Sequence, residues 1–340
     1  MSGEILVLTQ PDDTHASHMS ELLARRGADV VIFDPEDYPA KAVIDISYEP
    51  SGQVRRTLRT ESRRVDLDGL TALWTRRPQS PVCHPEIADP VTRAHLEKEL
   101  AIFTGDLWNQ LDCLMVPGPF EILKIAGRKP SQLALAGRLG FECPSTLITN
   151  DPDEFLDFYN RHEGRIITKP LHMPWAPKND GENVSRLSEL VSPRDIGYAD
   201  AIRFAPMIIQ GYVPKQVELR VTVVGDRVFA AEIHSQESNH TRFDWRRYDS
   251  AMTRHAVHEL PPELTERCVR LVRELGLVYG AIDLILTPDG RYVFLEINPN
   301  GQWLWIEEAT GLPISEALCD MLLHGGTPTP KEADGAESRA

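Results

Sequence analysis

The chain has 340 residues, 41% of them hydrophobic and 26% charged, an ordinary balance for a globular protein with more than one domain. Its formal net charge of -15 argues against a general affinity for nucleic acid or anionic lipid, because neutralising phosphates requires clustered Lys and Arg. Any anion must therefore be bound at a local site. We expect neither a nucleic-acid partner nor a membrane partner.

Five cysteines are scattered through the chain without a C-x-x-C pair, so neither a disulfide framework nor a zinc site is indicated. The N-terminus "MSGEILVLTQPDD" lacks the basic start and the long apolar run of a signal peptide, and no later stretch is apolar enough to cross a membrane. We expect reduced thiols and a cytoplasmic location. Residues 326–340 are polar and rich in Gly, Pro and Ala, which predicts a disordered tail.

The first predicted domain covers residues 1–118 and opens with a strand, a helix and a second strand, at 4–10, 14–27 and 28–35. This β-α-β order predicts a parallel, Rossmann-like layer. The loop after the first strand, "TQPDDTHAS", lacks the Gly-x-Gly-x-x-Gly spacing that holds a dinucleotide pyrophosphate, so this domain is not the expected cofactor site. The layer is completed by a strand, a helix and a strand, at 69–81, 93–111 and 113–118.

A central domain at 119–205 and a C-terminal domain at 206–325 are expected to follow. The central part alternates helices and strands, at 127–141, 144–151, 152–162 and 164–171. Its next segment, 172–185, is rich in Pro, Gly and Asn and has no periodicity, which inside a compact domain is typical of a functional loop. The C-terminal part consists mostly of strands, with helices at 262–276 and 313–325. The fold class is therefore α/β (α+β).

The stretch "AIDLILTPDGRYVFLEIN" predicts two strands joined at Pro-Asp-Gly. If Asp289 and Gly290 form a two-residue turn, Asp283 lies directly opposite Glu296, with their Cβ atoms about 5 Å apart. Asn298 then projects from the same face, because strand side chains alternate with period two. A four-residue loop would keep this face with a diagonal offset, whereas a bulge would break the register. Two carboxylates this close repel each other without a cation, and two acids with an amide suit Mg²⁺. A single acid in a strand is more often solvent-facing or paired with Arg, but the shared register of the three groups favours a metal site.

Two lysines suit phosphate groups. Lys169 ends an apolar strand, and Lys129 lies at a helix start, where the helix dipole favours an anion over a cation. Each lysine alone is more often a surface residue. Both beside a metal-binding hairpin would suit a triphosphate.

A short apolar strand leads into a segment whose backbone can read the edge of adenine. The next strand carries Glu218 and Arg220 on one face, where a carboxylate can hold ribose hydroxyls and an arginine can steady phosphate charge. An ordinary Glu and Arg on an exposed strand face explains the same spacing equally well. The candidate adenine-facing residues are Gln210, Gly211, Tyr212 and Val213.

Several arginines are candidates for substrate recognition. Arg76 and Arg77 end a predicted strand of the first domain, where strand C-termini face a crevice, and they suit either a substrate carboxylate or an interdomain salt bridge. A later basic loop suits acidic peptide side chains, although such a loop is more often simply solvated. Its arginines are Arg242, Arg246 and Arg247. His255 and His258 have the spacing of one helix face but lack a third nearby ligand for a metal.

These residues resemble a known family. Lys129, Lys169 and the motifs "IIQGYVPKQVELR", "GAIDLIL" and "FLEINPNG", in this order, resemble the ATP-grasp carboxylate–amine ligases. Within that superfamily the chain is most similar to the maturases that crosslink ribosomal peptides into graspetides such as the microviridins. The likeness is carried by "ALWTRRP", "FECPSTLITNDP", "VFAAEIHSQ", "DWR" and "FLEINPNGQWLWIEEATGLPI".

The resemblance implies an ATP-grasp fold behind an N-terminal pre-ATP-grasp domain, with ATP between the central and C-terminal domains. It implies that Lys129 and Lys169 bind the phosphates and that Arg220 approaches the transferring phosphate. The 210–213 segment would face adenine and Glu218 would hold the ribose. Asp283, Glu296 and Asn298 match the Mg²⁺ ligands, with two ions expected. The 172–185 segment occupies the place of the lid over the triphosphate, but it lacks the Gly-rich run of other family members.

The implied activity is the conversion of Asp or Glu side chains of a precursor peptide into acyl phosphates, which Ser or Thr hydroxyls or Lys amines then attack. The leader and core of that peptide are the expected partners, and a homodimer is kept open. Two alternatives share the same ATP residues. One is a ligase that adds a free amino acid to a protein tail or small acid, and the other is a nucleotide-binding regulatory module without turnover.

Overall fold

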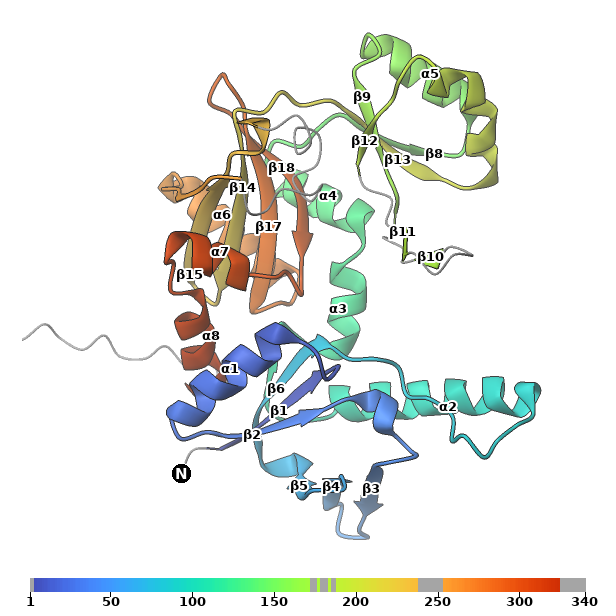
Figure 1. The fold of residues 1–340 in the computed structure, drawn as a ribbon, viewed down its shortest axis with the longest axis vertical. Helices are drawn as coiled ribbons and strands as arrows, with labels where there is room; N and C mark the ends of the chain where they lie inside the picture. Colours follow the sequence, from blue (N-terminus) through green and yellow to red (C-terminus); the bar gives the residue numbers. More distant parts are fainter. Residues whose placement is uncertain (1–2, 172–175, 178–182, 185–187, 238–252, 325–340) are drawn as a thin grey trace, which may run out of the picture.

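The computed structural model describes residues 3–171, 176–177, 183–184, 188–237 and 253–324. The N-terminal unit is built on a parallel sheet in the order β2-β1-β6-β7 (Figure 1). Its strands are nearly continuous apolar runs, as expected for parallel strands buried on both faces, and the predicted layer is confirmed. Its elements are β1 (Glu4–Thr9), α1 (Thr14–Arg25), β2 (Asp29–Phe33), β6 (Leu70–Arg77), α2 (Pro90–Asn109) and β7 (Leu114–Val116).

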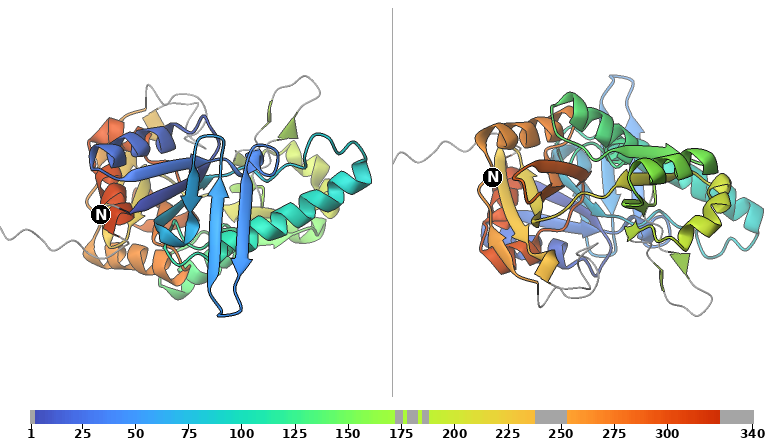
Figure 2. Two further views of the ribbon diagram at one scale, coloured as in Figure 1. Left: turned by 90° about the horizontal axis from the view of Figure 1, so that it is seen from below. Right: turned by 90° about the horizontal axis from the view of Figure 1, so that it is seen from above.

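A small antiparallel sheet between β2 and β6 was not predicted. It consists of β3 (Val43–Tyr48), β4 (Val54–Arg59) and β5 (Arg64–Asp66), flanked by the short helices η1 (Pro35–Asp37) and η2 (Leu67–Gly69). Leu58 and Val65 are fully buried and join it to the core of the N-terminal unit. The views in Figure 2 show it projecting beyond the parallel sheet.

The central unit is an antiparallel sheet in the order β12-β9-β13-β8, covered by α5 and η3. Its last strand, β13, pairs with both β8 and β9, so the chain leaves this sheet after Gly211 rather than at the predicted boundary of 205. A two-residue ladder, β10 (Ala176–Pro177) with β11 (Asn183–Val184), lies within the predicted lid segment. The other elements are β8 (Thr146–Thr149), α5 (Pro152–Arg161), β9 (Ile166–Lys169), β12 (Glu189–Leu190), η3 (Asp195–Phe204) and β13 (Met207–Gly211).

The C-terminal unit is a five-stranded antiparallel sheet in the order β16-β15-β14-β17-β18. One face packs against α3 (Phe120–Ala126), α4 (Lys129–Arg138) and α6 (Pro262–Glu274). The helix over 129–138 therefore belongs to the core of this sheet, although its sequence position suggested the central domain. The strands are β14 (Val217–Val224), β15 (Arg227–Ile233), β16 (His255–Val257), β17 (Tyr279–Leu286) and β18 (Tyr292–Asn298), with η4 (Ser235–Glu237) after β15.

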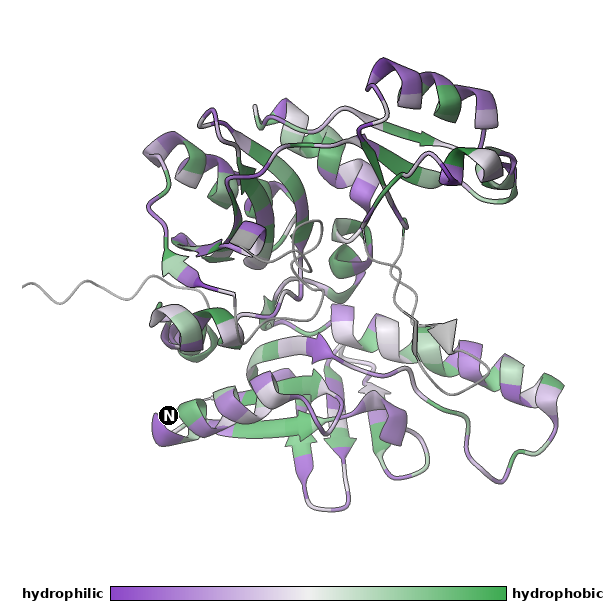
Figure 3. Cartoon of the chain, turned by 45° about the horizontal axis from the view of Figure 1, so that its top comes forward, coloured by the Kyte–Doolittle hydropathy of each residue, from purple (hydrophilic) through white to green (hydrophobic). Residues whose placement is uncertain are grey.

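The opposite face of this sheet meets the N-terminal unit. Helices α7 (Leu304–Thr310) and α8 (Ile314–His324) share one hydrophobic core with α1, β1 and β6. Figure 3 shows hydrophobic residues concentrated along the strands of these sheets. Within the described ranges, no helix is long and apolar enough to cross a membrane. The predicted tail at 326–340 lies outside the described residues.

Candidate functional site

The β17–β18 hairpin places Asp283 directly opposite Glu296, as predicted from the sequence. The route to this register differs from the prediction. Thr287 N–H donates to the Arg291 carbonyl, so the turn has three residues and shifts the pairing by one position. A bulge between Asp283 and Leu284 shifts it back, because Leu284 faces Phe294 and Asp283 faces Glu296. The predicted two-residue turn is wrong, whereas the predicted acid pair is confirmed.

Each of the two carboxylates is paired with a cation. Arg220, from the adjacent strand β14, donates through Nη1 to Asp283 Oδ1 at 2.7 Å. Lys129, at the start of α4, forms an ion pair with Glu296. Asn298 Nδ2 donates to Asp283 Oδ2 at 3.1 Å and lies 3.5 Å from Glu296 Oε1. The five polar groups come from β14, β17, β18 and α4 and meet at one patch of the sheet.

This donor set suits a hard divalent cation. Two carboxylates and an amide oxygen are the ligands that Mg²⁺ and similar ions prefer. The amide of Asn298 presents its nitrogen to both acids, so it must turn over to offer its oxygen. In the described part of the chain no group of three His, Cys, Asp or Glu is arranged to hold a metal. Oxygens from another molecule, such as phosphate or water, would therefore have to complete the coordination.

Glu218 and Arg220 are both buried, at 6% exposure, so the alternative of an exposed strand face is wrong. Glu218 Oε1 accepts hydrogen bonds from Lys215 Nζ at 2.5 Å and from Ser235 Oγ at 3.0 Å. A carboxylate held in this way is fixed in orientation and available to hydroxyl donors through its other oxygen. Nothing in the sequence distinguishes Lys215 from an ordinary surface lysine.

The remaining nucleotide candidates lie on the central sheet. Lys169 is the last residue of β9 and is half-buried, and its place beside the acids stays a prediction because it belongs to a different sheet. Gln210 is buried and donates to Thr146 Oγ1 at 3.0 Å. The backbone N–H groups of Gly211 and Tyr212 donate to the carbonyls of Ser145 and Arg165. Contact with a base would then rest on the carbonyls of this segment and on Val213.

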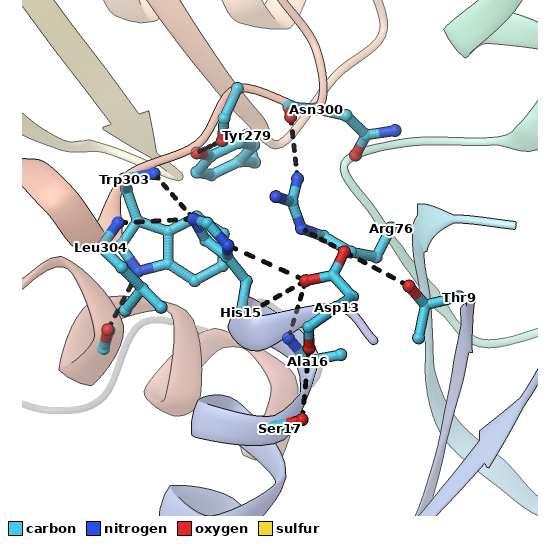
Figure 4. Close-up of polar contacts among 12 residues, drawn as sticks. Thr9, Asp13, His15, Ala16, Ser17, Arg76, Tyr279, Asn300, Trp303 and Leu304 are labelled. Carbon is cyan, nitrogen blue, oxygen red and sulfur yellow. Dashed lines mark hydrogen bonds and ion pairs between the residues drawn. The ribbon is translucent and has the colours of Figure 1, made fainter. Parts of the chain in front are cut away.

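Arg76 is buried at the contact between the N-terminal and C-terminal units (Figure 4). Its Nε lies 3.4 Å from Asp13 Oδ2, and its Nη1 donates to the Asn300 carbonyl at 2.8 Å. The guanidinium also lies over the Trp303 ring, with Cζ 5.4 Å from the centroid. These contacts favour a structural role for Arg76 over contact with a substrate carboxylate. They differ from the predicted interdomain salt bridge, because the ion pair lies within the N-terminal unit and the bond to the C-terminal unit is to a backbone carbonyl. Arg77 is exposed, and Arg242, Arg246 and Arg247 lie outside the described residues.

Two further polar residues with long-range contacts carried only a weak signal in the sequence. Gln132 lies in the core-facing side of α4 and hydrogen-bonds to β18. His15 follows the helix cap Asp13 and accepts from the backbone N–H of Trp303 at 3.3 Å. A polar residue at a core position of a helix is a weak hint of such contacts, but the partner, far away in sequence, cannot be identified without the fold.

Family comparisons agree with this architecture. The sequence profile of the MvdD pre-ATP grasp domain matches residues 4–121, and that of the RimK-like ATP-grasp domain matches residues 133–322, more than half of the chain. The chain belongs to the RimK-like ATP-grasp family. The predicted ATP-grasp fold with its pre-ATP-grasp domain is thereby confirmed.

Solved ATP-grasp structures cover nearly the whole chain. A RiPP-associated ATP-grasp ligase from Chryseobacterium gregarium, solved with ADP and a leader and core peptide, is 27% identical with a TM-score of 0.87, over 96% of this chain and 98% of that one. The macrocyclase MdnC from Microcystis aeruginosa, bound to its precursor peptide MdnA, is also 27% identical, with a TM-score of 0.82, over 94% and 99%. The predicted kinship with the ATP-grasp maturases of ribosomal peptides is confirmed.

A second group of relatives carries a different name. A probable alpha-L-glutamate ligase from Xanthomonas euvesicatoria is 26% identical over 269 residues, which is 76% of this chain and 84% of that protein. Both groups consist of ligases, so an ATP-grasp ligase is supported in either case. They differ in the molecule that is joined.

Proposed function

We propose that this protein is an ATP-dependent ligase that activates Asp or Glu side chains of a ribosomal precursor peptide and crosslinks them within that peptide. The observation that carries the proposal is the opposed pair Asp283 and Glu296, each held by its own cation, Arg220 or Lys129. The likeness to a peptide-bound ATP-grasp ligase over 96% of the chain supports the choice of substrate.

Nucleotide binding is assigned to the residues around this pair. Lys129 and Lys169 would bind the phosphates of ATP, and Arg220 would approach the phosphate that is transferred. Residues 210–213 would face adenine, and Glu218, already oriented by Lys215 and Ser235, would hold the ribose. Asp283, Glu296 and Asn298 would hold Mg²⁺, with two ions expected. When bound, Mg²⁺ supplies positive charge that neutralises phosphate oxygens.

The cation paired with each acid explains how the site stays folded and can still accept a metal ion. Two carboxylates this close are stable only with opposite charge nearby, and Arg220 and Lys129 provide it here. Asp283, Glu296 and Asn298 would hold a divalent ion, whose charge would stand in for that of the two cations. Arg220 and Lys129 would then be available to phosphate oxygens, which carry the charge that moves in the reaction.

The chemistry follows from the poor reactivity of a carboxylate, whose leaving group would be oxide. Attack of a peptide carboxylate oxygen on the γ-phosphorus breaks the bond to ADP and forms an acyl phosphate. A Ser or Thr hydroxyl, or a Lys amine, then attacks the acyl carbon, loses a proton and expels phosphate. The first nucleophiles give an ester and the second gives an amide. Arg220 would stabilise the phosphate charge in the first step.

The peptide is expected to contribute a leader that docks and a core that reaches the phosphate end of ATP. Arg77 is exposed at the end of β6 and suits an acidic side chain of the core, as do Arg242, Arg246 and Arg247. A homodimer stays a prediction, as does a cytoplasmic location.

A second candidate function is the addition of glutamate to an acceptor carboxylate. It is favoured by the relatives named alpha-L-glutamate ligase, one of which matches 76% of this chain. The two functions change mass in opposite directions. Crosslinking removes one water per bond from a peptide, whereas glutamate addition makes the acceptor heavier.

Mass spectrometry tests the proposal. The protein is incubated with ATP, Mg²⁺ and a precursor peptide with repeated Thr and Asp or Glu, to be sought in a short reading frame beside the gene. We expect a mass loss of one water per crosslink, abolished by Glu296→Gln and retained by Glu308→Gln, an exposed acid on α7 that serves as the control. A Glu296→Gln protein with unchanged turnover would exclude the metal site, and a heavier product with glutamate present would favour the second function.

A further inference from the structure

The amide side chain of Gln132 clasps the backbone of Ile297. Gln132 is only 2% exposed, in the first turns of α4. Its Oε1 accepts from the Ile297 N–H at 3.2 Å, and its Nε2 donates to the Ile297 carbonyl at 2.8 Å. Nε2 also donates to the carbonyl of Ala126, the last residue of α3, at 2.6 Å. One side chain therefore fixes the end of one helix and the edge of a strand.

The hydrogen bonds from Gln132 satisfy backbone groups of β18 on the side that has no neighbouring strand. β18 is the edge strand of the five-stranded sheet and pairs with β17 on its other side. A buried backbone N–H or carbonyl without a hydrogen-bond partner is destabilising, so this edge must be satisfied. Further along the same edge, the Phe294 N–H donates to the Glu142 carbonyl at 2.8 Å. At Ile297 the amide of Gln132 takes the place of a neighbouring strand.

Ile297 is the residue between Glu296 and Asn298. Because successive side chains of a strand project to opposite faces, fixing the Ile297 backbone fixes the direction of both neighbours. Helix α4 also carries Lys129, three residues before Gln132, and its amine pairs with Glu296. Helix α4 therefore positions the strand that carries Glu296 and Asn298. It also supplies Lys129, which balances the charge of Glu296.

We infer that Gln132 is a positioning residue for the cation site, acting through the Ile297 backbone on Glu296 and Asn298. The inference rests on the proposed function, since it concerns the same ligands. Partners of this kind hold ligands in the geometry that an ion requires, and their loss typically weakens metal affinity by about 10- to 100-fold. An apolar side chain of similar size would fill the same space and remove both hydrogen bonds to the Ile297 backbone.

The test compares Gln132→Met with Leu135→Ala, a core change in the same helix at a side chain that cannot hydrogen-bond to the Ile297 backbone. Mn²⁺ binding in the presence of ADP is measured by electron paramagnetic resonance, and hydrogen exchange reports on the Ile297 amide. We expect Gln132→Met to weaken Mn²⁺ binding by about tenfold or more and to speed exchange at Ile297. If Leu135→Ala lowers the melting temperature as much as Gln132→Met does, its Mn²⁺ affinity should still stay within about twofold of the wild-type value.

Unchanged Mn²⁺ affinity in Gln132→Met, with wild-type protein binding normally, overturns this inference and leaves the proposed function standing. Equal weakening of Mn²⁺ binding by Leu135→Ala also overturns it, because general destabilisation would then explain both effects. Wild-type protein that fails to bind Mn²⁺ with ADP overturns the site itself. If Gln132→Met does not fold, Gln132→Glu is measured in its place, because it keeps the acceptor for the Ile297 N–H and loses the donor.

Discussion

The guanidinium of Arg76, at the end of β6, donates a hydrogen bond to the backbone carbonyl of Asn300, 2.8 Å away in the loop that follows β18. Asn300 lies two residues after the proposed ligand Asn298. The N-terminal unit therefore holds the segment that leaves the candidate site, through a charge buried at 2% exposure. Burial lowers the pKa of Arg76, and the carboxylate of Asp13 opposes that shift.

Replacing Arg76 should be costly because it strands Asp13 as a buried charge. We expect Arg76→Met to lower the free energy of unfolding by about 3–5 kcal/mol in a urea titration. Arg77→Met, at the exposed neighbouring position, should change it by less than about 0.5 kcal/mol. The double variant Asp13→Asn with Arg76→Met should recover part of the loss, since Asn still caps α1 and carries no charge. No recovery would show that the lost ion pair is not the cause.

Stability should fall in acid partly through His15. Burial, with a smaller contribution from Arg76, lowers the pKa of His15 to about 3 from its ordinary value of 6.5. Between these two values the unfolded chain binds a proton that the folded chain does not, so the free energy of unfolding decreases as pH falls from 6.5 towards 3. One such proton contributes about 1.4 kcal/mol per pH unit.

The variant His15→Gln separates this effect from other acid-sensitive groups. It should be less stable than wild type at neutral pH, because the N–H of Trp303 loses its acceptor. Its unfolding free energy should nevertheless depend less steeply on pH between about 6 and 4. Equal slopes for the two proteins in chemical denaturation would mean that His15 titrates normally in the folded state.

Gly301 is required by close packing against β17. A Cβ at this position would lie 2.2 Å from the Cβ of Ala281, which is fixed to the strand. Gly301→Ala should therefore destabilise the protein by about 1–3 kcal/mol, measured by thermal or urea unfolding. Adding Ala281→Gly removes the clash and should restore much of the loss. Gly290→Ala has open space but a positive φ of 82°, so Ala281→Gly should not rescue it.

The fold could be predicted largely from local signals, because most of its helices and strands have clear periodicity. Two segments depart from this pattern. The small sheet at 43–66 was missed because β4 and β5 are rich in Arg and β5 has only three residues, so Leu58 and Val65 alone do not reveal a core. His255 begins strand β16 rather than a helix, because pairing with β15 overrides the spacing of the two histidines.

The candidate site could be predicted only where its contacts are local. The pairing of Asp283 with Glu296 follows from one hairpin, and even there the three-residue turn and the bulge compensate for each other. The ion pair of Lys129 with Glu296 spans 167 positions in the chain, and no sequence pattern links them. Such contacts depend on how α4 packs on the sheet, which is a property of the whole fold.

In the proposed reaction a substrate carboxylate attacks the γ-phosphate of ATP beside Asp283 and Glu296. The most direct measurement uses precursor peptide whose Asp and Glu carboxylates carry a heavy oxygen isotope, with mass analysis of the released phosphate. We predict one heavy oxygen transferred from peptide to phosphate for every crosslink formed, and no transfer with Glu296→Gln. Crosslinked peptide accompanied by unlabelled phosphate would contradict the account.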